Sequence, residues 1–289
     1  MFYKIYCKKK QDKNFEDYYQ TIIANKCGDD EFQVIHYNDS TKFMKILDKD
    51  SHHIFLYRFP PRILHFLPFF IHQKIPLYFL NTEQLSLPHH CDYIKKLHPY
   101  IQIIDYSFSN FIITNQFRKN TYYLPYTINP IEIYKNIPKT KDICMIYPGN
   151  GSVRRHNIIH LLRKNGIPVD IIKGYGKDRD LQLAQYKIIL NIHYHLGYKI
   201  FEEIRCNRCI YNKMIVISET SILDEQYPLK EYMIKVPYLN FVQKVKEVWK
   251  NYDKYYEELF QNYDEEKIRN EYNKSYNHFF GKNKNITMV

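Results

Sequence analysis

Short apolar runs alternate with amphipathic segments along nearly the whole chain, and this alternation most restricts what it can fold into. The apolar runs have the length and the branched or aromatic side chains typical of buried strands. Segments with helical spacing, such as 152–165 and 200–212, lie between many of them. Strands that alternate with helices favour parallel sheets covered on both faces. The predicted strands are 2–7, 32–37, 53–58, 76–80, 101–105, 121–124, 142–147, 168–172, 187–192, 214–218 and 232–236.

The length and the grouping of these strands predict an α/β protein with two Rossmann-like domains facing across a cleft. A chain of 289 residues with 45% hydrophobic residues can bury two cores. The segment 126–142 is polar, contains two prolines and has no sustained periodicity, so we place the boundary there. The predicted domains are residues 1–130 and 131–289. The aromatic and charged pattern after Asn240 predicts terminal helices that close one domain and cross back to the other.

The net charge of +11 favours anionic partners, which include nucleotides, nucleic acid and an acidic membrane surface. A codon bias toward A and T would also enrich lysine, so the charge alone does not choose among them. The first ten residues lack the apolar core of a signal peptide, and no apolar run approaches the ~20 residues of a membrane helix. We therefore expect a cytoplasmic protein whose six cysteines are reduced.

The stretch 142–172 is typical of a βαβ unit with an anion site at its first turn. Glycines in the loop allow a close approach of the backbone, and the helix that opens near Ser152 offers unpaired N–H groups to a phosphate. Two arginines fall in the first turn, where cations oppose the helix dipole, and a bound anion would explain them. The alternative is a plain tight turn. The predicted anion-site residues are Gly149, Gly151, Ser152, Arg154 and Arg155.

The strand 187–192 brings Asn191 and His193 to its carboxyl end. Ligands of open parallel sheets bind beyond that edge. A lone histidine after a strand is usually structural, but here another polar motif follows. We therefore predict that both side chains line the ligand site.

The stretch from Lys199 to Glu219 contains Cys206-x-x-Cys209, and two glutamates and two arginines lie within the seven residues 202–208. A closed zinc site needs four ligands, and no second Cys-x-x-Cys exists to complete one. A solvated helix face would explain the charges singly. It does not explain why Glu202 and Arg205, three residues apart on one helix face, follow a strand that ends in Asn-x-His. We interpret this pair as part of a binding site for an anionic ligand.

This order of motifs resembles the C-terminal domain of GT-B glycosyltransferases, and most closely the group-1-like enzymes encoded by giant DNA viruses and some bacteria. The resemblance implies that the domain holds a UDP-, GDP- or dTDP-sugar donor. It further implies that Glu202 contacts hydroxyls of the donor, and that Arg205 with Arg154 or Arg155 neutralises the diphosphate. The Glu-x7-Glu pattern of retaining enzymes is absent, since Ile210 and Tyr211 occupy the second position. The matching positions are Asn191, His193, Glu202, Arg205, Asn207, Ser218 and Glu219.

The first half resembles the acceptor domain of the same enzymes more weakly, through the strand that ends in Asn81-Thr82-Glu83-Gln84. A carboxylate at a strand end could deprotonate an acceptor hydroxyl, so Glu83 is the candidate catalytic base. The alternative is that Glu83 caps the helix near 86–97.

An Asp-x-Asp motif occurs at 48–50 and again at 178–180, but neither follows a buried strand, where a metal-binding motif would lie. We therefore predict a glycosyltransferase that needs neither a metal nor another cofactor, and that acts on a glycan, protein or lipid hydroxyl in the cytoplasm of a host cell if the chain is viral. Stable nucleic-acid binding is not expected, while contact with a membrane surface is compatible with the charge. The alternative is a protein that binds a nucleotide-sugar or nucleic acid without catalysis.

Overall fold

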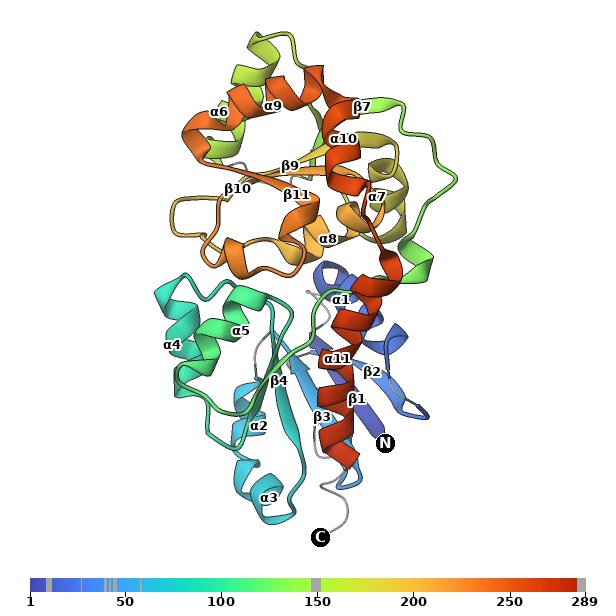
Figure 1. Cartoon of the computed structure of the whole chain (residues 1–289). Coiled ribbons are helices and arrows are strands. Elements are labelled where there is room, and N and C mark those ends of the chain that lie inside the picture. The colour runs from blue at the N-terminus through green and yellow to red at the C-terminus, as the bar shows by residue number, and fades with distance from the viewer. Residues whose placement is uncertain are drawn as a thin grey trace. The chain divides into compact units, whose positions relative to one another are not determined.

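The computed structural model describes residues 1–8, 12–26, 28–38, 41, 43, 46–57, 59–146 and 152–284, and it confirms the predicted α/β class with two parallel sheets. The chain divides into two compact units (Figure 1). The first unit comprises Met1–Tyr126 and Asn270–Val289, and the second comprises Thr127–Arg269.

The first unit is built on a six-stranded sheet with the order β2-β1-β3-β4-β5-β6, in which every pairing is parallel. All residues of β3 and β4 are buried, because a sheet covered on both faces has no solvent side. The strands are β1 (Phe2–Lys8), β2 (Glu31–Tyr37), β3 (Ser51–Leu56), β4 (Leu77–Asn81), β5 (Gln102–Asp105) and β6 (Thr121–Tyr123). The helices are α1 (Asp12–Ala24), α2 (Pro61–Leu64), α3 (Leu67–His72), α4 (Pro88–Lys96) and α5 (Phe108–Asn115).

The second unit is built on a five-stranded parallel sheet with the order β11-β10-β9-β7-β8. Helices lie on both sides of it, with α9 on one side and α8 on the other in Figure 1. The strands are β7 (Lys141–Ile146), β8 (Asp170–Ile172), β9 (Tyr186–Asn191), β10 (Ile215–Glu219) and β11 (Met233–Val236). The α-helices are α6 (Val153–Lys164), α7 (Gly176–Leu183), α8 (Glu203–Tyr211), α9 (Phe241–Lys250) and α10 (Tyr252–Phe260). Short 3₁₀ helices are η2 (Pro130–Glu132), η3 (Asp224–Gln226), η4 (Lys230–Tyr232) and η5 (Tyr238–Asn240).

Each predicted strand coincides with an observed one to within about two residues. The strands are short runs rich in apolar residues between more polar segments, so their positions can be recognised from the sequence alone. The end of α6 is also explained by the sequence, because a glycine follows the helix two residues after its last residue, Lys164. Gly166 adopts a φ of 73°, the left-handed conformation that ends a helix and that glycine adopts without steric cost. Among the helices of the described chain, none is both long enough and apolar enough to cross a bilayer.

The last helix, α11 (Glu265–Lys284), makes the unit boundary differ from the predicted division at residue 130. Residues from Asn270 onward belong to the first unit, whereas the predicted second domain included everything from 131 to 289. The helices α9 and α10 stay in the second unit, so only α11 continues into the first.

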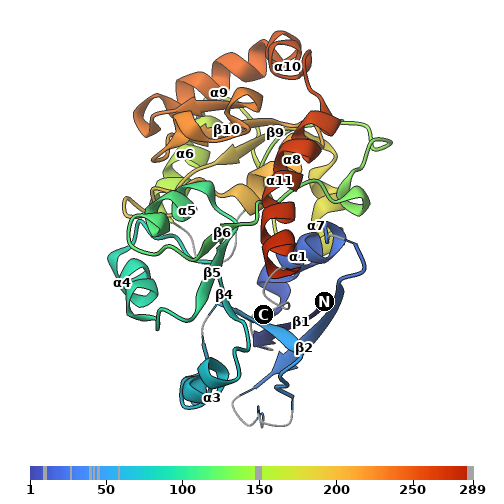
Figure 2. The ribbon, with the colours of Figure 1, turned by 60° about the horizontal axis from the view of Figure 1, so that its bottom comes forward.

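Aromatic side chains explain why the end of α11 packs with the first sheet, beside which it runs in both Figure 1 and Figure 2. Tyr276, Phe279 and Phe280 are all fully buried. The Phe279 ring lies 5.0 Å from that of Tyr122 and 5.3 Å from that of Tyr78, centroid to centroid. The Tyr276 hydroxyl is also buried, and it donates to the carbonyl of Pro125 at 2.9 Å. The first core is therefore incomplete without the end of the chain.

Replacement of Phe279 by alanine should lower the free energy of unfolding by about 3–5 kcal/mol, because it leaves a cavity between the helix and the sheet. Urea denaturation followed by circular dichroism measures the change. Phe69→Ala is the matched control, since that ring is 47% exposed, and we expect it to cost less than about 1 kcal/mol. Equal losses in the two variants would show that α11 does not contribute to the core.

Candidate functional site

The carboxyl ends of β9 and β10 bring together polar residues that the sequence places 27 positions apart. The two strands are parallel neighbours, with Ser218 opposite Asn191 in the register. The Asn191 amide donates to the Ser218 hydroxyl at 3.0 Å, and both residues are buried. This edge of a parallel sheet is where ligands of α/β proteins bind.

Arg205 extends this polar row from the first turn of α8. Its guanidinium donates to the Asn191 side-chain oxygen at 3.0 Å and lies 3.9 Å from the Glu202 carboxylate. The helix begins at Glu203 rather than near residue 200 as predicted, so Glu202 is the N-cap residue, although its side chain makes no capping hydrogen bond. The Glu202 and Arg205 side chains are 24% and 14% exposed, so both can reach a ligand at this edge.

Glu219, the last residue of β10, is a buried carboxylate with two donors. It pairs with Arg154 of α6 and accepts the backbone N–H of His193 at 3.1 Å. The Arg154 guanidinium also lies 3.9 Å from the centre of the Tyr238 ring, and the Tyr238 hydroxyl donates to the Arg154 carbonyl at 3.0 Å. Arg154 therefore already has a protein carboxylate that balances its charge in the first turn of α6. A bound anion is not needed to explain its position.

Arg155 is also engaged within the protein. Its side chain is buried, and its Nε donates to the carbonyl of Ile192 at 2.7 Å, which holds the chain just beyond β9. Ser152 is the N-cap residue of α6, as predicted from the helix start, and accepts the Arg155 backbone N–H at 3.4 Å. Gly149 and Gly151, which complete the predicted anion site, lie outside the described residues.

His193 presents an unused acceptor at the same edge. Its Nε2 lies 3.2 Å from the carbonyl of Thr220 and 3.2 Å from the Ser221 hydroxyl. Because a carbonyl only accepts, and the Ser221 hydroxyl can give its own proton to the Glu219 carbonyl, we assign the ring proton to Nε2. Burial lowers the pKa of His193, against the opposing effect of Glu219, so the ring is neutral at physiological pH. Its Nδ1 is then a buried acceptor, and no group of the described chain donates to it. A ligand hydroxyl or N–H could fill that place.

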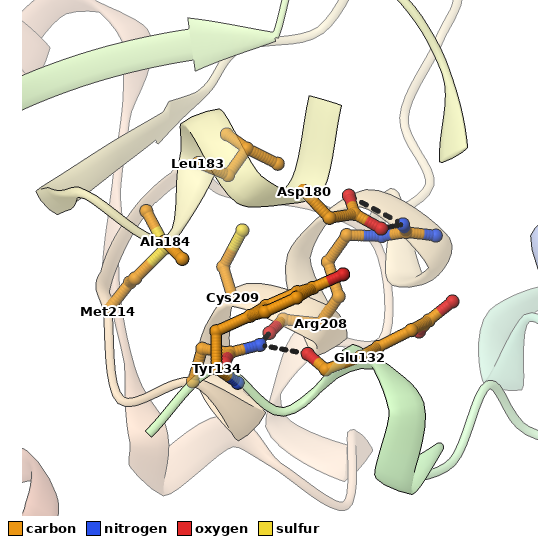
Figure 3. A pocket seen from close by; sticks show the side chains of 9 residues that line it. Glu132, Tyr134, Asp180, Leu183, Ala184, Arg208, Cys209 and Met214 are labelled. Atoms are coloured by element: carbon orange, nitrogen blue, oxygen red, sulfur yellow. Dashed lines mark hydrogen bonds and ion pairs between the residues drawn. The ribbon is translucent and has the colours of Figure 1, made fainter. Parts of the chain in front are cut away.

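The Cys-x-x-Cys lies inside α8 and is part of the packing. Cys206 and Cys209 are fully buried, and burial raises the pKa of both thiols, that of Cys209 to about 12. Within the ranges that the structure covers, no three His, Cys, Asp or Glu side chains form a group suited to a metal. The next arginine of the helix, Arg208, pairs with the buried Asp180 at 2.8 Å, and Figure 3 shows both beside a small cavity of about 10 Å³.

That ion pair also accounts for the Asp-x-Asp at 178–180, since Asp180 is neutralised by Arg208 and by Arg179. In the other Asp-x-Asp, Asp48 pairs with Lys4 of β1. Both motifs therefore have partners within the protein.

In the first unit, the loop after β4 is fixed by a network around Asp105, the last residue of β5. The buried Asp105 carboxylate accepts from the Asn81 amide at 2.7 Å, from the Ser107 N–H at 2.9 Å and from the Asn110 amide at 3.2 Å. The Asn81 and Asn110 amides also donate to the carbonyl of Glu83 at 2.9 Å each. The position of Glu83 is thus set by Asn81 at the end of β4 and Asn110 of α5, both of which donate to Asp105.

The Glu83 carboxylate lies 3.3 Å from Nε2 of His90 in the first turn of α4. The alternative role of Glu83 as a helix cap is wrong, because the N-cap residue of α4 is Leu87 and no side chain caps it. Side-chain exposures of 27% for Glu83 and 15% for His90 leave the pair open to a hydroxyl group. A carboxylate beside an imidazole is a common arrangement for accepting a proton.

The side chains of these two clusters that were not predicted from the sequence include His90, Asp105 and Tyr238. His90 lies seven residues after Glu83, and nothing in the local sequence indicates that the two side chains meet. Asp105 could have been found from the sequence, because it is a polar residue at the end of the predicted strand 101–105 and therefore at the carboxyl edge of the sheet. Tyr238 lies in η5, 84 positions from the Arg154 that it contacts, and nothing in the local sequence indicates the pairing.

Comparison with known proteins adds sequence relatives and fold relatives. No family model matches the chain. The uncharacterized protein R358 of Acanthamoeba polyphaga mimivirus is 32% identical over 243 residues, which cover 82% of this chain and 85% of that protein. The uncharacterized mimivirus protein L140 is 35% identical over 172 residues, or 57% of this chain and 55% of its own.

Among solved structures, that of HepE from Anabaena in complex with UDP-glucose matches with a TM-score of 0.59 at 9% identity, over 95% of this chain and 99% of HepE. TarM matches with a TM-score of 0.54 at 14% identity, over 81% of this chain, and the chain spans only 56% of TarM. These likenesses concern the fold alone. They confirm the prediction of a GT-B glycosyltransferase fold.

Burial raises the pKa of Asp105 from 3.8 to about 7, although the hydrogen bonds from Asn81, Ser107 and Asn110 act in the opposite direction. Between about pH 4 and pH 7 the folded state therefore holds a proton that the unfolded chain has lost. The contribution of Asp105 to stability then falls as pH rises through this window, by about 1 kcal/mol per pH unit, and levels off above it.

Urea unfolding between pH 5 and pH 8 should show this slope in the native chain. The slope should be reduced in Asp105→Asn and retained in Asp92→Asn, whose side chain is 58% exposed. Equal slopes in the native chain and Asp105→Asn would contradict this assignment.

Proposed function

The chain belongs to the same family as protein R358 of Acanthamoeba polyphaga mimivirus, and we propose that it is a glycosyltransferase that moves a sugar from a nucleotide-sugar donor to a hydroxyl acceptor. The observation that supports this most is the polar row at the carboxyl edge of the second sheet, in a fold shared with HepE, whose structure holds UDP-glucose. The row combines a partly exposed arginine, a partly exposed carboxylate and an unused buried acceptor.

The donor would bind at this edge of the second unit. Arg205 is the arginine best suited to the diphosphate, since its partners are one neutral amide and a carboxylate at 3.9 Å. Glu202 would accept hydrogen bonds from donor hydroxyls, and Nδ1 of His193 would accept another. Arg154 and Glu219 together would form the floor of the site. Because Glu219 partly neutralises Arg154, this arginine would attract the diphosphate less strongly than Arg205 would.

Leaving-group charge would then be stabilised by fixed side chains, with Arg205 as the main cation, and we propose that no metal is required. Because Arg205 is hydrogen-bonded to Asn191, it is oriented before the donor binds. Such preorganisation avoids rearrangement as charge develops on the diphosphate.

In the first unit we propose that Glu83 and His90 act as the base toward the acceptor. His90 would accept the proton of the attacking hydroxyl and could then transfer a proton to Glu83. The hydrogen bonds around Asp105 would keep the loop that carries Glu83 in place. Catalysis by such a positioned base typically contributes 10²- to 10⁴-fold in rate.

Isothermal titration calorimetry with UDP-, GDP- and dTDP-sugars tests the donor site. Arg205→Ala should weaken binding by about 1.5–3 kcal/mol, roughly 10- to 150-fold in Kd, and Glu202→Ala should weaken it by a smaller factor. Arg163→Ala, which changes an arginine at the opposite end of α6, is the control and should bind normally. Unchanged affinity in both Arg205→Ala and Glu202→Ala would show that the donor binds elsewhere.

Turnover tests the proposed base separately from donor binding. Glu83→Gln and His90→Gln should each lower kcat by about 10²-fold or more, while the Kd of the donor stays within about twofold. A donor that binds without any transfer by the native chain would instead support the alternative of a non-catalytic binding protein.

A further inference from the structure

A second cavity of the second unit lies at the edge of the sheet opposite the proposed donor site. Its volume is about 430 Å³, which is within the usual range for small-molecule sites. Lys139, two residues before β7, and Lys213, two residues before β10, both line it. Residues that precede parallel strands lie at the amino edge of a sheet, so this cavity is separate from the row at Arg205 and Glu219.

Positive charge exceeds negative charge around this cavity. Lys135, Lys139 and Lys213 line it, together with a single carboxylate, that of Glu265. The carboxylate is already shared between Lys135 at 3.4 Å and Arg269 at 3.0 Å. Two lysines are therefore left without a balancing acid in the wall of the cavity.

Lys139 is the more unusual of the two. Its side chain is partly buried, and burial lowers its pKa. No hydrogen bond or ion pair joins its ammonium group to the part of the chain that the structure describes. The nearby thiols of Cys144 and Cys209 are neutral, since burial raises the pKa of both, and do not balance it. A partly buried ammonium group without a counter-charge lowers the stability of the folded state, and a bound anion would remove this cost.

The rest of the wall is aromatic and able to form hydrogen bonds. Four tyrosines line the cavity, and the buried hydroxyl of Tyr263 has no partner within the described chain. The ammonium of Lys213 lies 5.1 Å from the centre of the Tyr263 ring. Lys213 itself adopts a φ of 50°, a left-handed conformation that costs a lysine about 1–2 kcal/mol. Tyrosine faces accept the apolar side of a sugar ring, and their hydroxyls can bond to its hydroxyls.

The wall is also formed in advance. The side-chain oxygen of Asn212 accepts the backbone N–H of Tyr134 at 2.8 Å, and its amide donates to the carbonyls of Glu132 and Arg208 at 2.8 Å each. These bonds fix Tyr134 against the end of α8. Figure 3 shows Tyr134 from the side of the smaller cavity, which it also lines, next to Arg208 and Glu132.

We propose that this cavity binds a sugar that carries a phosphate or a carboxylate, with Lys139 and Lys213 at the anionic group and the tyrosines at the ring. The site is independent of the proposed transferase activity. It would allow the protein to hold an acidic glycan away from its catalytic centre.

Binding of glucose 6-phosphate, glucuronate, glucose and inorganic phosphate to the full chain tests the proposal, measured by calorimetry and by ligand-observed NMR. Both acidic sugars should bind at least tenfold more tightly than glucose or phosphate alone. Lys139→Met should weaken them at least tenfold, while its Tm stays equal to or above that of the native chain, because methionine fills the space without an unpaired charge. Lys177→Met, a change of an exposed lysine on α7, should alter neither quantity.

Three results would overturn the proposal. They are equal binding of phosphate and glucose 6-phosphate, tighter binding of AMP than of either acidic sugar, and unchanged affinity in Lys139→Met. A fall in Tm of Lys139→Met with unchanged binding would assign the lysine a structural role only. None of these outcomes depends on whether UDP-, GDP- or dTDP-sugars bind at Arg205.

Discussion

The buried carboxylate of Glu219 is the interaction on which the second unit depends. It ends β10, pairs with Arg154 at the start of α6, and accepts the backbone N–H of His193 just after β9. Three segments that are far apart in the sequence are thereby joined at one edge of the sheet. A buried acid of this kind is stable only with its partners present, so the loss of Arg154 would leave an uncompensated charge, and the loss of the His193 N–H would leave an unsatisfied acceptor. These bonds hold the edge in place before the proposed donor binds.

The strands, and the grouping of polar residues at the carboxyl edge of the second sheet, could be predicted from the sequence because both depend on local pattern. A continuous apolar run such as that of β10 identifies a strand covered on both faces, and the polar residues that follow it must lie at the carboxyl edge. Asn191 and Ser218 were found in this way, and the structure joins them by a hydrogen bond. Glu202 and Arg205 were paired from their three-residue spacing, and the structure places their charged groups 3.9 Å apart, although Glu202 precedes the helix as its N-cap residue.

The pairing of charges could not be predicted, since it depends on which segments meet in three dimensions. Arg154 and Arg155 looked like two free cations at a helix start, yet one is neutralised by Glu219 and the other is buried against the Ile192 carbonyl. The predicted division at residue 130 lies four residues from the observed one after Tyr126, but α11 was assigned to the second domain for the same reason. The pattern after Asn240 predicted terminal helices that cross back, but it does not say that α11 alone does so or which rings of the first sheet it contacts.

The two edges of the second sheet handle positive charge in different ways, and this difference bears on function. At the carboxyl edge each arginine has a protein partner, so the proposed donor would join or compete with existing bonds and be positioned by them. At the amino edge no acid of the described residues pairs with Lys139 or Lys213, and the one carboxylate of the cavity wall, that of Glu265, is shared between Lys135 and Arg269. Preorganised charge suits a transition state, whose demands are geometric. Uncompensated charge in an aromatic cavity suits simple retention of an anion, for which a net electrostatic gain on binding is sufficient.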